Sequence, residues 1–411
     1  MASTVPTGAE ERMTADSDDR SVEQRRLLLA LVGAIFMINL DARVVTPLLP
    51  TIASDFRTTV SAAGVLVTAY VLPYGLFQLV YGPLADRFGK VRIVAVAMIF
   101  FSVGTALCGL PPSLPAIVAL RFLTGVAAAA VFPLTLAYVG DTVPYVRRQE
   151  TIALLATSSA AAAAFSTAAG GLIAAVVSWR LVFPIFGVIS GVVTIVLLLL
   201  RRSEIRTTPP MPRPRMRETF GAALRAPRML PLLLLVCAEG AIYNGAFIYL
   251  GGFLNERFAL GALAIGLVLA GAGVAQLGAA RLLARLVRRF GERRLILGGG
   301  GLMGAAYISA VAMPSWPLFL LPVCCAGAGF VLCHSTLQTR ATETFPASRG
   351  TAVALFAFSL FLGNGLGAIV VGLAVDGFGY TATLIGSGLL LWAFALAAAR
   401  LLFAPHAAEG R

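Results

Sequence analysis

The chain has 411 residues, of which 58% are hydrophobic and 12% are charged, whereas charged residues make up roughly a quarter of an ordinary soluble domain. Apolar stretches of about 20 residues, each long enough to cross a bilayer, recur from position 27 to about 403. The composition therefore excludes a soluble protein. The net charge of +13 does not indicate nucleic-acid binding, because the basic residues lie in the connections between apolar stretches and not on one soluble face.

Charged residues, prolines and glycines break the apolar sequence into twelve segments, and each is predicted to be a transmembrane helix. Residues 1–26, which precede the first segment, are polar with mixed charge and are expected to form a disordered cytoplasmic tail. The predicted helices are 27–50, 60–81, 93–111, 116–139, 151–176, 181–200, 230–253, 262–283, 295–313, 317–338, 350–374 and 381–403.

A long connection divides these helices into two groups of six. Residues 201–229 contain eight Arg and two Glu together with several Pro, which predicts a basic linker that lies against anionic headgroups. The predicted domains are therefore a first bundle at 27–200 and a second bundle at 230–403, followed by a short cytoplasmic tail at 404–411.

The two halves carry a weak internal repeat. RFGKVRIV at 87–94 matches RFGERRLI at 289–296, and TIALLA beginning at 151 matches TAVALFA beginning at 351. One such repeat per six-helix half is typical of transporters whose substrate site lies near the bilayer midplane between two bundles. The sequence thus predicts an all-α integral membrane protein with twelve helices in two pseudo-symmetric bundles.

The distribution of Lys and Arg predicts the orientation in the membrane. One set of connections is rich in basic residues, whereas the connections on the other side hold only Arg57, Arg180 and Arg257. Cytoplasmic loops carry the excess of Lys and Arg. Both termini are therefore expected on the cytoplasmic side of a cell membrane.

Several short motifs resemble those of a known family. GPLADRFGKVR at 82–92 is similar to the signature loop between helices 2 and 3 of the major facilitator superfamily, and ARLVRRFGERR at 284–294 resembles its second-half copy. RFLTG at 121–125 resembles the helix 4 motif, and LDARVVTPLLPTIASDF at 40–56 resembles helix 1 of the drug:proton antiporter branch. The resemblance implies a twelve-helix transporter that works by alternating access.

The resemblance also implies a contact that joins the two halves on the cytoplasmic side. In the loop at 82–92, Gly82 permits close approach of two helices, and Asp86 is able to accept from the N–H groups at a helix N-terminus. The implied partner is the start of helix 11 near Arg349 and Gly350. The basic residues of the loop are also explained by topology alone. The predicted clasp comprises Gly82, Asp86, Arg87, Gly89, Lys90 and Arg349.

Four charged side chains lie well inside predicted helices, namely Asp41, Arg43, Arg121 and Glu239. A charge at a helix centre costs roughly 2.5–3.5 kcal/mol on insertion scales, so it persists only beside a partner or a water-filled cavity. Asp41 and Arg43 are two residues apart, which is about 200° around a helix, and therefore they cannot pair with each other.

The family resemblance places helices 1 and 4 around the central cavity and so puts Asp41 opposite Arg121. Loss of Arg121 in one conformation would let Asp41 take up a proton, and its return would expel that proton. Substrate and proton would then compete for one carboxylate. A permanent ion pair that locks the two helices is the structural alternative. Glu239 is a third proton-coupling candidate, with a role in binding cations or a structural hydrogen bond as alternatives.

Polar and aromatic residues complete the predicted substrate cavity. Helical spacing puts Tyr70, Tyr74 and Gln78 on one face of helix 2 and puts Tyr243 one turn after Glu239. An aromatic stripe at this spacing is also compatible with simple packing. The predicted cavity residues are Asn39, Arg43, Tyr70, Tyr74, Gln78, Tyr243, His334 and Gln338.

Two of these residues leave alternatives open. Arg43 either attracts anionic groups in the cavity, extends toward the interface of the membrane, or contacts Glu239. His334 is the only histidine in a predicted helix, and both a packed core role and a proton relay fit it. Cys325, Cys333 and His334 lack the spacing of a metal site.

The energy source and the class of function follow from what the sequence lacks. Lys90 is the only lysine, and Leu84 stands where an ATP-binding loop needs glycine. There is also no nucleophile, base and orienting group at a recognisable spacing, so we predict neither an enzyme nor a cofactor or metal. The predicted function is proton-coupled efflux of small amphipathic compounds, such as drugs or metabolites, by a monomer in the bilayer.

The alternative is a proton symporter or uniporter that imports a small metabolite. Helix 5 of the exporter branch usually carries a Gly-Pro pair four residues ahead of a Gly-Gly pair. Here Gly170 and Gly171 are preceded by Ser166 and Thr167, which makes the direction of transport less secure than the fold.

Overall fold

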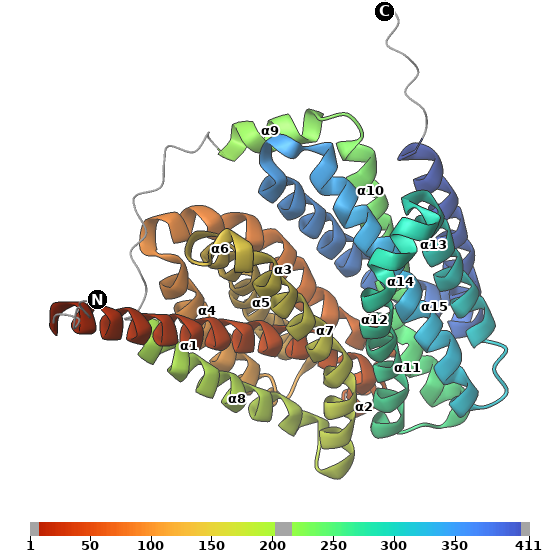
Figure 1. Ribbon diagram of the computed structural model, residues 1–411. Coiled ribbons are helices and arrows are strands. Elements are labelled where there is room, and N and C mark those ends of the chain that lie inside the picture. Colours follow the sequence, from red (N-terminus) through yellow and green to blue (C-terminus); the bar gives the residue numbers. More distant parts are fainter. Residues whose placement is uncertain (1–7, 202–215, 404–411) are drawn as a thin grey trace, which may run out of the picture.

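The regular structure of the protein is helical. The computed structural model describes residues 8–201 and 216–403, and these ranges contain helices and turns but no strand (Figure 1). The first half contains α1 (Gly8–Val44), η1 (Thr46–Leu48), α2 (Leu49–Asp55), α3 (Val60–Phe88), α4 (Lys90–Leu107), α5 (Leu114–Ala128), α6 (Val131–Thr142), α7 (Tyr145–Val176) and α8 (Trp179–Leu200). The second half contains α9 (Met216–Arg225), α10 (Met229–Glu239), η3 (Gly240–Asn244), α11 (Gly245–Phe258), α12 (Ala262–Phe290), α13 (Glu292–Ala310), α14 (Trp316–Thr344), η4 (Pro346–Ser348) and α15 (Arg349–Leu401).

Twelve helical crossings are present in the described ranges, as the sequence predicts. Ten stretches are long and apolar enough to cross a bilayer. The last of them comprises two crossings, because Gly379, with a φ of 74°, turns the chain within α15. The remaining crossing is α13, whose charged start and run of glycines lower its mean hydropathy. The prediction of twelve transmembrane helices is confirmed, with ends that differ by several residues.

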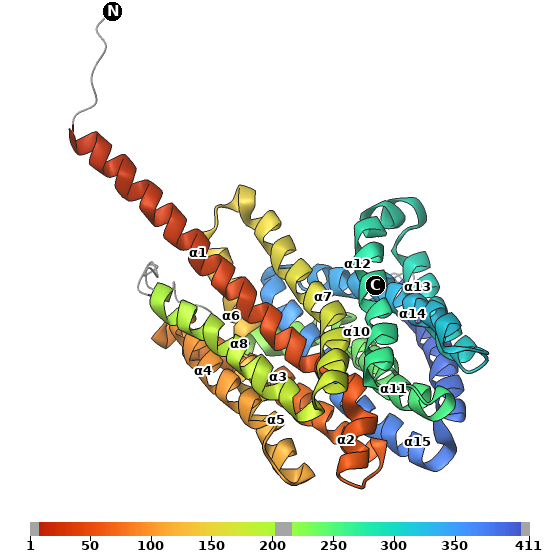
Figure 2. The same cartoon turned by 90° about the horizontal axis from the view of Figure 1, so that it is seen from below.

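The structure differs from the sequence prediction at two hydrophilic segments. Residues 8–26 were expected to be disordered, but α1 extends back to Gly8 as a long rod that leaves the first bundle (Figure 2). Extending an existing helix adds one hydrogen bond per residue without a new nucleation step, which explains the difference. Residues 216–225 of the expected linker form the helix α9. Residues 1–7, 202–215 and 404–411 of the predicted tails and linker lie outside the described residues.

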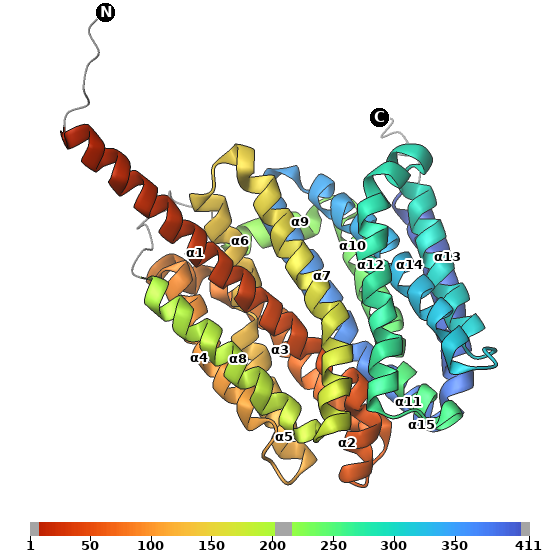
Figure 3. The same ribbon diagram turned by 60° about the horizontal axis from the view of Figure 1, so that its bottom comes forward.

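The helices form two bundles that meet along two helix pairs. Contacts join α1 to α7 and α8, and α3 to α5, within the first half, and they join α12, α13 and α14 within the second. Across the boundary, α7 packs against α12 and α3 packs against α15. Figure 3 shows α7 and α12 side by side where the two bundles meet. These two helix pairs form the boundary between the bundles.

Two turns of the same sequence identify one side of the molecule. The RFG motifs of the internal repeat end at Gly89 and Gly291, whose φ angles of 91° and 75° are in the region that favours glycine. Each turn joins two antiparallel helices, α3 to α4 and α12 to α13. We call the side that carries these two turns the basic side, and the opposite side the far side.

The bundles are in backbone contact on the far side. A Cβ atom on Gly171 of α7 would lie 2.4 Å from the carbonyl oxygen of Ala262, and one on Gly266 of α12 would lie 2.2 Å from that of Thr167. Only glycine allows two helices to approach so closely. The far side of the α7 and α12 pair is therefore closed in this conformation.

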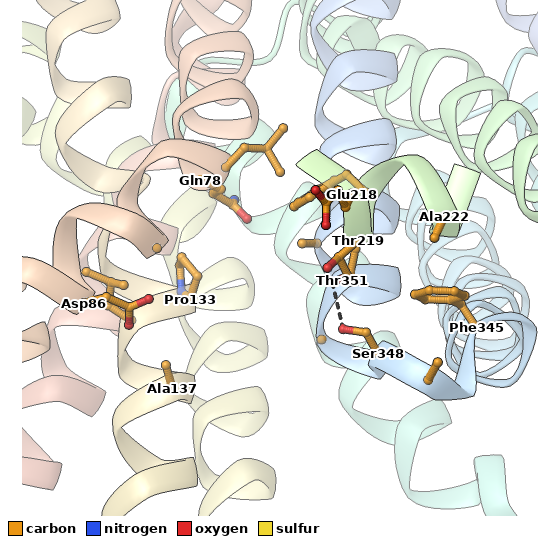
Figure 4. Close-up of a pocket in the computed structure, with 17 residues that line it drawn as sticks. Gln78, Asp86, Pro133, Ala137, Glu218, Thr219, Ala222, Phe345, Ser348 and Thr351 are labelled. Carbon is orange, nitrogen blue, oxygen red and sulfur yellow. Dashed lines mark hydrogen bonds between the residues drawn. The ribbon is translucent and has the colours of Figure 1, made fainter. Parts of the chain in front are cut away.

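The bundles separate on the basic side and leave a cavity of about 1020 Å³ between them. Figure 4 shows its two walls, with Asp86 and Pro133 on the wall from the first bundle and Ser348 and Thr351 on the other. The second wall includes α9, because Glu218, Thr219 and Phe220 line the same cavity. The protein is thus open toward the basic side and closed toward the far side.

Candidate functional site

A buried ion pair joins two helices of the first bundle. Arg121 of α5 donates through Nη1 to Oδ2 of Asp41 on α1 at 2.5 Å, and through Nη2 to the Asp41 carbonyl oxygen at 3.3 Å. Both side chains are 0% exposed. The structure therefore brings together the two residues that the sequence placed opposite each other. Their attraction offsets part of the free-energy cost of burying each charge.

Tyrosine completes the surroundings of this pair. The guanidinium of Arg121 lies over the Tyr70 ring at 4.3 Å, and the Tyr70 hydroxyl donates to the Ile38 carbonyl oxygen at 3.0 Å. Oδ1 of Asp41 and Nε of Arg121 make no hydrogen bond with a described residue. One carboxylate oxygen thus remains available to accept a proton or another donor once the site opens.

A second buried pair joins two helices of the second bundle. Oε2 of Glu239, at the end of α10, lies 2.8 Å from Nδ1 of His334 on α14. The Glu239 side chain is 0% exposed, and its Oε1 has no hydrogen bond among the described residues. The His334 ring stacks on Phe330 at 4.7 Å. The sequence proposed a role for each residue separately but did not predict that they pair.

The backbone changes its geometry directly after Glu239. Residues Gly240–Asn244 form one turn of π-helix between α10 and α11, and such turns are frequent at functional sites. This turn presents Tyr243, whose ring stacks on Phe330 at 4.6 Å. The π-turn thus places the buried carboxylate and this aromatic stack next to each other in the second bundle.

The predicted cavity residues separate into two groups. Gln78 lines the cavity on the basic side, whereas Tyr70 is buried beneath Arg121 and Tyr74 packs against Phe361 of α15 with ring centres 4.7 Å apart. Asn39 donates to the carbonyl oxygen of Ile35 at 2.8 Å and to Ser159 of α7 at 3.4 Å. Gln338 is exposed and is not among the residues that line this cavity.

Arg43 lies on the other face of α1 from Asp41, as the spacing of the two residues requires. It is partly buried, and its guanidinium lies within electrostatic range of the Tyr243 hydroxyl in the second bundle. Arg43 makes no ion pair or hydrogen bond with the described part of the chain. The contact with Glu239 that the sequence left open is not formed in this conformation.

The residues of the predicted clasp lie around the open end of the molecule. Gly82 and Asp86 line the cavity on one wall, and Gly350, which follows Arg349, lines the other. The two sides of the clasp thus face each other across the cavity (Figure 4). Arg87 and Arg349 are exposed, and Gly89 makes the turn. A contact that closes the clasp remains a prediction for a conformation in which this cavity is closed.

Lys90, which the sequence placed in the predicted clasp, pairs within the first bundle in this conformation. Its ammonium group donates to Asp141 at the end of α6, so it joins two helices of the same bundle. The equivalent place in the second half holds the pair of Arg340 and Glu292, with Nε and Oε2 2.5 Å apart. Neither pair was predicted from the sequence, although charged residues at helix ends in both halves were a signal.

The contribution of α9 to the cavity was also missed. In MRETFGAALR, the apolar residues Phe220 and Ala223 are three positions apart, and they pack on Met229 and Leu355. Polar residues such as Glu218 occupy another face and line the cavity. This amphipathic spacing was the available signal, and a basic Pro-rich context concealed it.

Comparison with known proteins agrees with the fold and the motifs. The model of the Major Facilitator Superfamily matches residues 31–358 and 253–411, which together cover most of the chain. The chain belongs to the major facilitator superfamily. It is therefore a multi-pass membrane transporter and a carrier, not an enzyme, as the sequence predicts.

The relatives within this superfamily are distant. The chain is 26% identical over 358 residues to the uncharacterized transporter YceJ of Bacillus subtilis strain 168, covering 85% of this chain and 88% of that protein. It is 23% identical over 360 residues to Multidrug resistance protein 1 of the same organism, covering 86% and 91% of the two chains.

Solved structures show the same fold. The bacterial homologue of the human lysosomal transporter Spinster superposes with a TM-score of 0.76 at 19% identity, covering 93% of this chain and 96% of that one. The chain therefore has the same arrangement of two six-helix bundles as the Spinster homologue. At this level of identity the likeness concerns the fold alone.

Proposed function

We propose that this transporter exports small amphipathic compounds across the cell membrane in exchange for protons. The observation that carries the proposal is the Asp41–Arg121 pair, which is completely buried between two helices of the first bundle. An ion pair in this place needs a reason beyond stability, because well-packed apolar residues are often as stabilising. A carboxylate that gains and loses a proton as the bundle rearranges supplies that reason.

The contacts of the pair indicate how a proton would be handled. While Arg121 donates to Asp41, the positive charge disfavours protonation of the carboxylate. A movement of α5 relative to α1 that lengthens this bond leaves Asp41 in an apolar site, where the neutral acid is favoured. Proton uptake is therefore linked to one conformation and proton release to the other, as exchange requires.

The open cavity on the basic side supports alternating access. If the positive-inside rule holds, this side faces the cytoplasm, so the conformation is inward-facing. The Spinster homologue with which the chain superposes is itself in an inward-facing, unoccupied conformation. A cavity that opens inward is where an exporter receives its substrate, and the closed far side would open after the bundles rock.

Support for the outward direction comes from relatives. The name of Multidrug resistance protein 1 fits an exporter of amphipathic compounds. The alternative is uptake of a metabolite by proton symport, and one observation favours it. The expected Gly-Pro pair is absent from α7. At its place the Ser166 hydroxyl donates to the Leu40 carbonyl oxygen, and this hydrogen bond joins α7 to α1.

A two-stage experiment tests the direction. A growth screen of a deletion strain against toxic amphipathic compounds first identifies a compound to which the protein gives resistance. Inside-out vesicles with an acidic interior should then accumulate that compound, because their interior corresponds to the outside of the cell. Accumulation only in right-side-out vesicles with an acidic exterior would contradict export and identify a symporter.

A further inference from the structure

One charged residue at the boundary between the bundles has no partner within the described structure. Arg43 forms no ion pair or hydrogen bond, while Asp41 on the opposite face of α1 is held by Arg121. An unpaired charge at this depth in a membrane protein costs several kcal/mol if it stays dry. Arg43 is partly buried at this boundary, so a ligand bound there would supply the partner that the protein does not.

The neighbours of Arg43 belong to the second bundle. Its guanidinium lies within electrostatic range of Tyr243, and the turn η1 that follows it packs against α11 and α12. A Cβ atom added to Gly251 of α11 would lie 3.2 Å from the Thr46 carbonyl oxygen, so the two backbones are close. Arg43 therefore reaches across the boundary that must change when the bundles move.

Two more polar groups lie beside this arginine. The Tyr243 side chain is 1% exposed, yet its hydroxyl has no hydrogen-bond partner in the described structure. Gln276 of α12, which is 8% exposed, lies within hydrogen-bonding reach of that hydroxyl, although the two groups do not meet full hydrogen-bond geometry. Leaving a buried polar group unpaired costs about 1–3 kcal/mol. The three groups together are thus available to a ligand that accepts hydrogen bonds.

We propose that Arg43, Tyr243 and Gln276 form an oxyanion subsite that binds the carboxylate of a small amphipathic substrate. All three side chains have N–H or O–H donors, and a guanidinium binds a carboxylate through two parallel hydrogen bonds. One guanidinium balances the single charge of a monocarboxylate, whereas a phosphate with a charge of about −2 retains an uncompensated charge in a dry site.

The surroundings suit the rest of such a molecule. The Tyr243 ring is stacked with Phe330 at 4.6 Å and lies 6.1 Å from Phe247, so apolar surface adjoins the donors. Glu239, one turn before Tyr243, is an acidic neighbour of the hydroxyl, and its Oε2 is held by His334 at 2.8 Å.

This inference rests on the proposed transport function, because it names the class of substrate. The test uses phenylbutyrate, phenylbutylamine and phenylbutanol, which share one apolar skeleton and differ in charge. Binding of each labelled compound to the purified full-length protein is measured by equilibrium dialysis. The wild-type protein should bind phenylbutyrate most tightly, by about tenfold or more, as expected for a charge-assisted hydrogen bond.

Variants assign the preference to the subsite. Arg43→Gln should weaken phenylbutyrate binding about tenfold or more while leaving phenylbutanol unchanged, and Tyr243→Phe should weaken it less. Arg43→Lys should retain part of the preference, because the charge remains. Arg281→Gln, at an exposed position of α12, should have no effect. Thermal unfolding shows whether each variant is folded. If Arg43→Gln is not folded, the binding preference of Arg43→Lys is compared with that of the wild-type protein instead.

Two results would overturn the subsite. One is a wild-type protein with no preference for the carboxylate, including the case in which none of the three compounds binds. The other is an Arg43→Gln variant that folds and keeps the same preference. These results are distinct from failure of the proposed function, because carboxylate preference without proton-driven export would contradict export alone. Proton-driven export without this preference would contradict the subsite alone.

Discussion

Glu239 and His334 lie 2.8 Å apart in the second bundle, and they join the helices that correspond to those joined by Asp41 and Arg121 in the first. In each half an acidic residue on the first helix meets a nitrogen base on the fourth. The depth differs, because Arg121 is in the third turn of α5 whereas His334 is about five turns into α14. The two pairs are therefore related by topology but are not copies, which allows them different roles.

Replacing His334 tests whether its contact stabilises the buried carboxylate. His334→Leu leaves the buried carboxyl group of Glu239 without its hydrogen-bond partner, so the free energy of unfolding should fall by about 1–3 kcal/mol. Adding Glu239→Gln should recover part of the loss, because an amide without its partner costs less to bury than a carboxyl group that is able to ionise. Chemical unfolding of the purified single and double variants in detergent measures both effects. A double variant no more stable than His334→Leu would show that Glu239 does not depend on this contact.

Substitutions at Asp41 and Arg121 should have strongly coupled effects on stability, and loss of the Asp41 carboxylate should abolish proton coupling. Arg121→Met leaves Asp41 buried without its partner, which costs about 3–5 kcal/mol. Asp41→Asn combined with Arg121→Met should be less destabilised than the sum of the two single changes. The same unfolding measurements give the coupling free energy of the pair.

Transport by the Asp41→Asn variant provides the functional half of this prediction. The variant should still bind substrate but should no longer accumulate it against its gradient, because the carboxylate that exchanges the proton is gone. Proton movement in weakly buffered proteoliposomes, measured together with substrate uptake, checks this. Glu256→Gln, at an exposed position of α11, is the matched control. Proton-coupled transport by Asp41→Asn at the wild-type rate would contradict the role of Asp41.

The clasp on the basic side should form when the far side opens. Asp86 and Ser348 now lie on opposite walls of the cavity, whereas Thr59 Oγ1 and Asp376 Oδ2 on the far side are 3.5 Å apart. Two cysteines cross-link only when their Cα atoms come within about 7 Å. Thr59→Cys with Asp376→Cys should therefore cross-link in the present conformation, and Asp86→Cys with Ser348→Cys in the opposite one.

The yields of the two cross-links should change in opposite directions. Conditions that favour the outward-open state, such as a substrate gradient in proteoliposomes, should increase the Asp86–Ser348 product and decrease the Thr59–Asp376 product. Gel mobility after mild oxidation measures both yields. Equal changes in both products would show that the two ends of the molecule do not alternate.

The sequence was sufficient for the helices and for part of the site. Apolar length and charge placement gave the crossings, because the bilayer forces every spanning segment to be long and apolar. The pairing of Asp41 with Arg121 was predicted because a buried charge needs a partner and because the family resemblance places helices 1 and 4 around the central cavity. The pairing of Glu239 with His334 was not, because it depends on the rotation of α10 and on the π-turn that follows it.

The repeat carried more information than the motifs that revealed it. Lys90 at the start of α4 pairs with Asp141, and Glu292 at the start of α13 pairs with Arg340. The two pairs join corresponding helices of the two halves with the charges reversed. A comparison of residue identities discards such a relationship, because the residues differ although the contact is retained. Patterns of charge compared between the halves would have predicted it.

Glycine contacts on the far side should set the balance between the two conformations. Gly171→Ala and Gly266→Ala each place a Cβ atom within 2.4 Å of a carbonyl oxygen in the other bundle. Overpacking of this kind costs about 1–3 kcal/mol, which shifts a two-state equilibrium by about 5- to 150-fold. The far side should therefore open in both variants. Gly278→Ala on α12 is the control, because its Cβ meets no atom within 4 Å.

Spin labels on the far side measure this shift directly. Ser113→Cys in the first half and Ala312→Cys in the second are in turns on that side, so the distance between labels on them reports opening. Double electron–electron resonance should show a larger population at long label-to-label distances in Gly171→Ala and Gly266→Ala than in Gly278→Ala. The added methyl group cannot fit while the backbones of α7 and α12 touch, and separation of the bundles is the change that relieves the overlap. An unchanged distance distribution would show that the helices adjust locally and that these glycines do not control the transition.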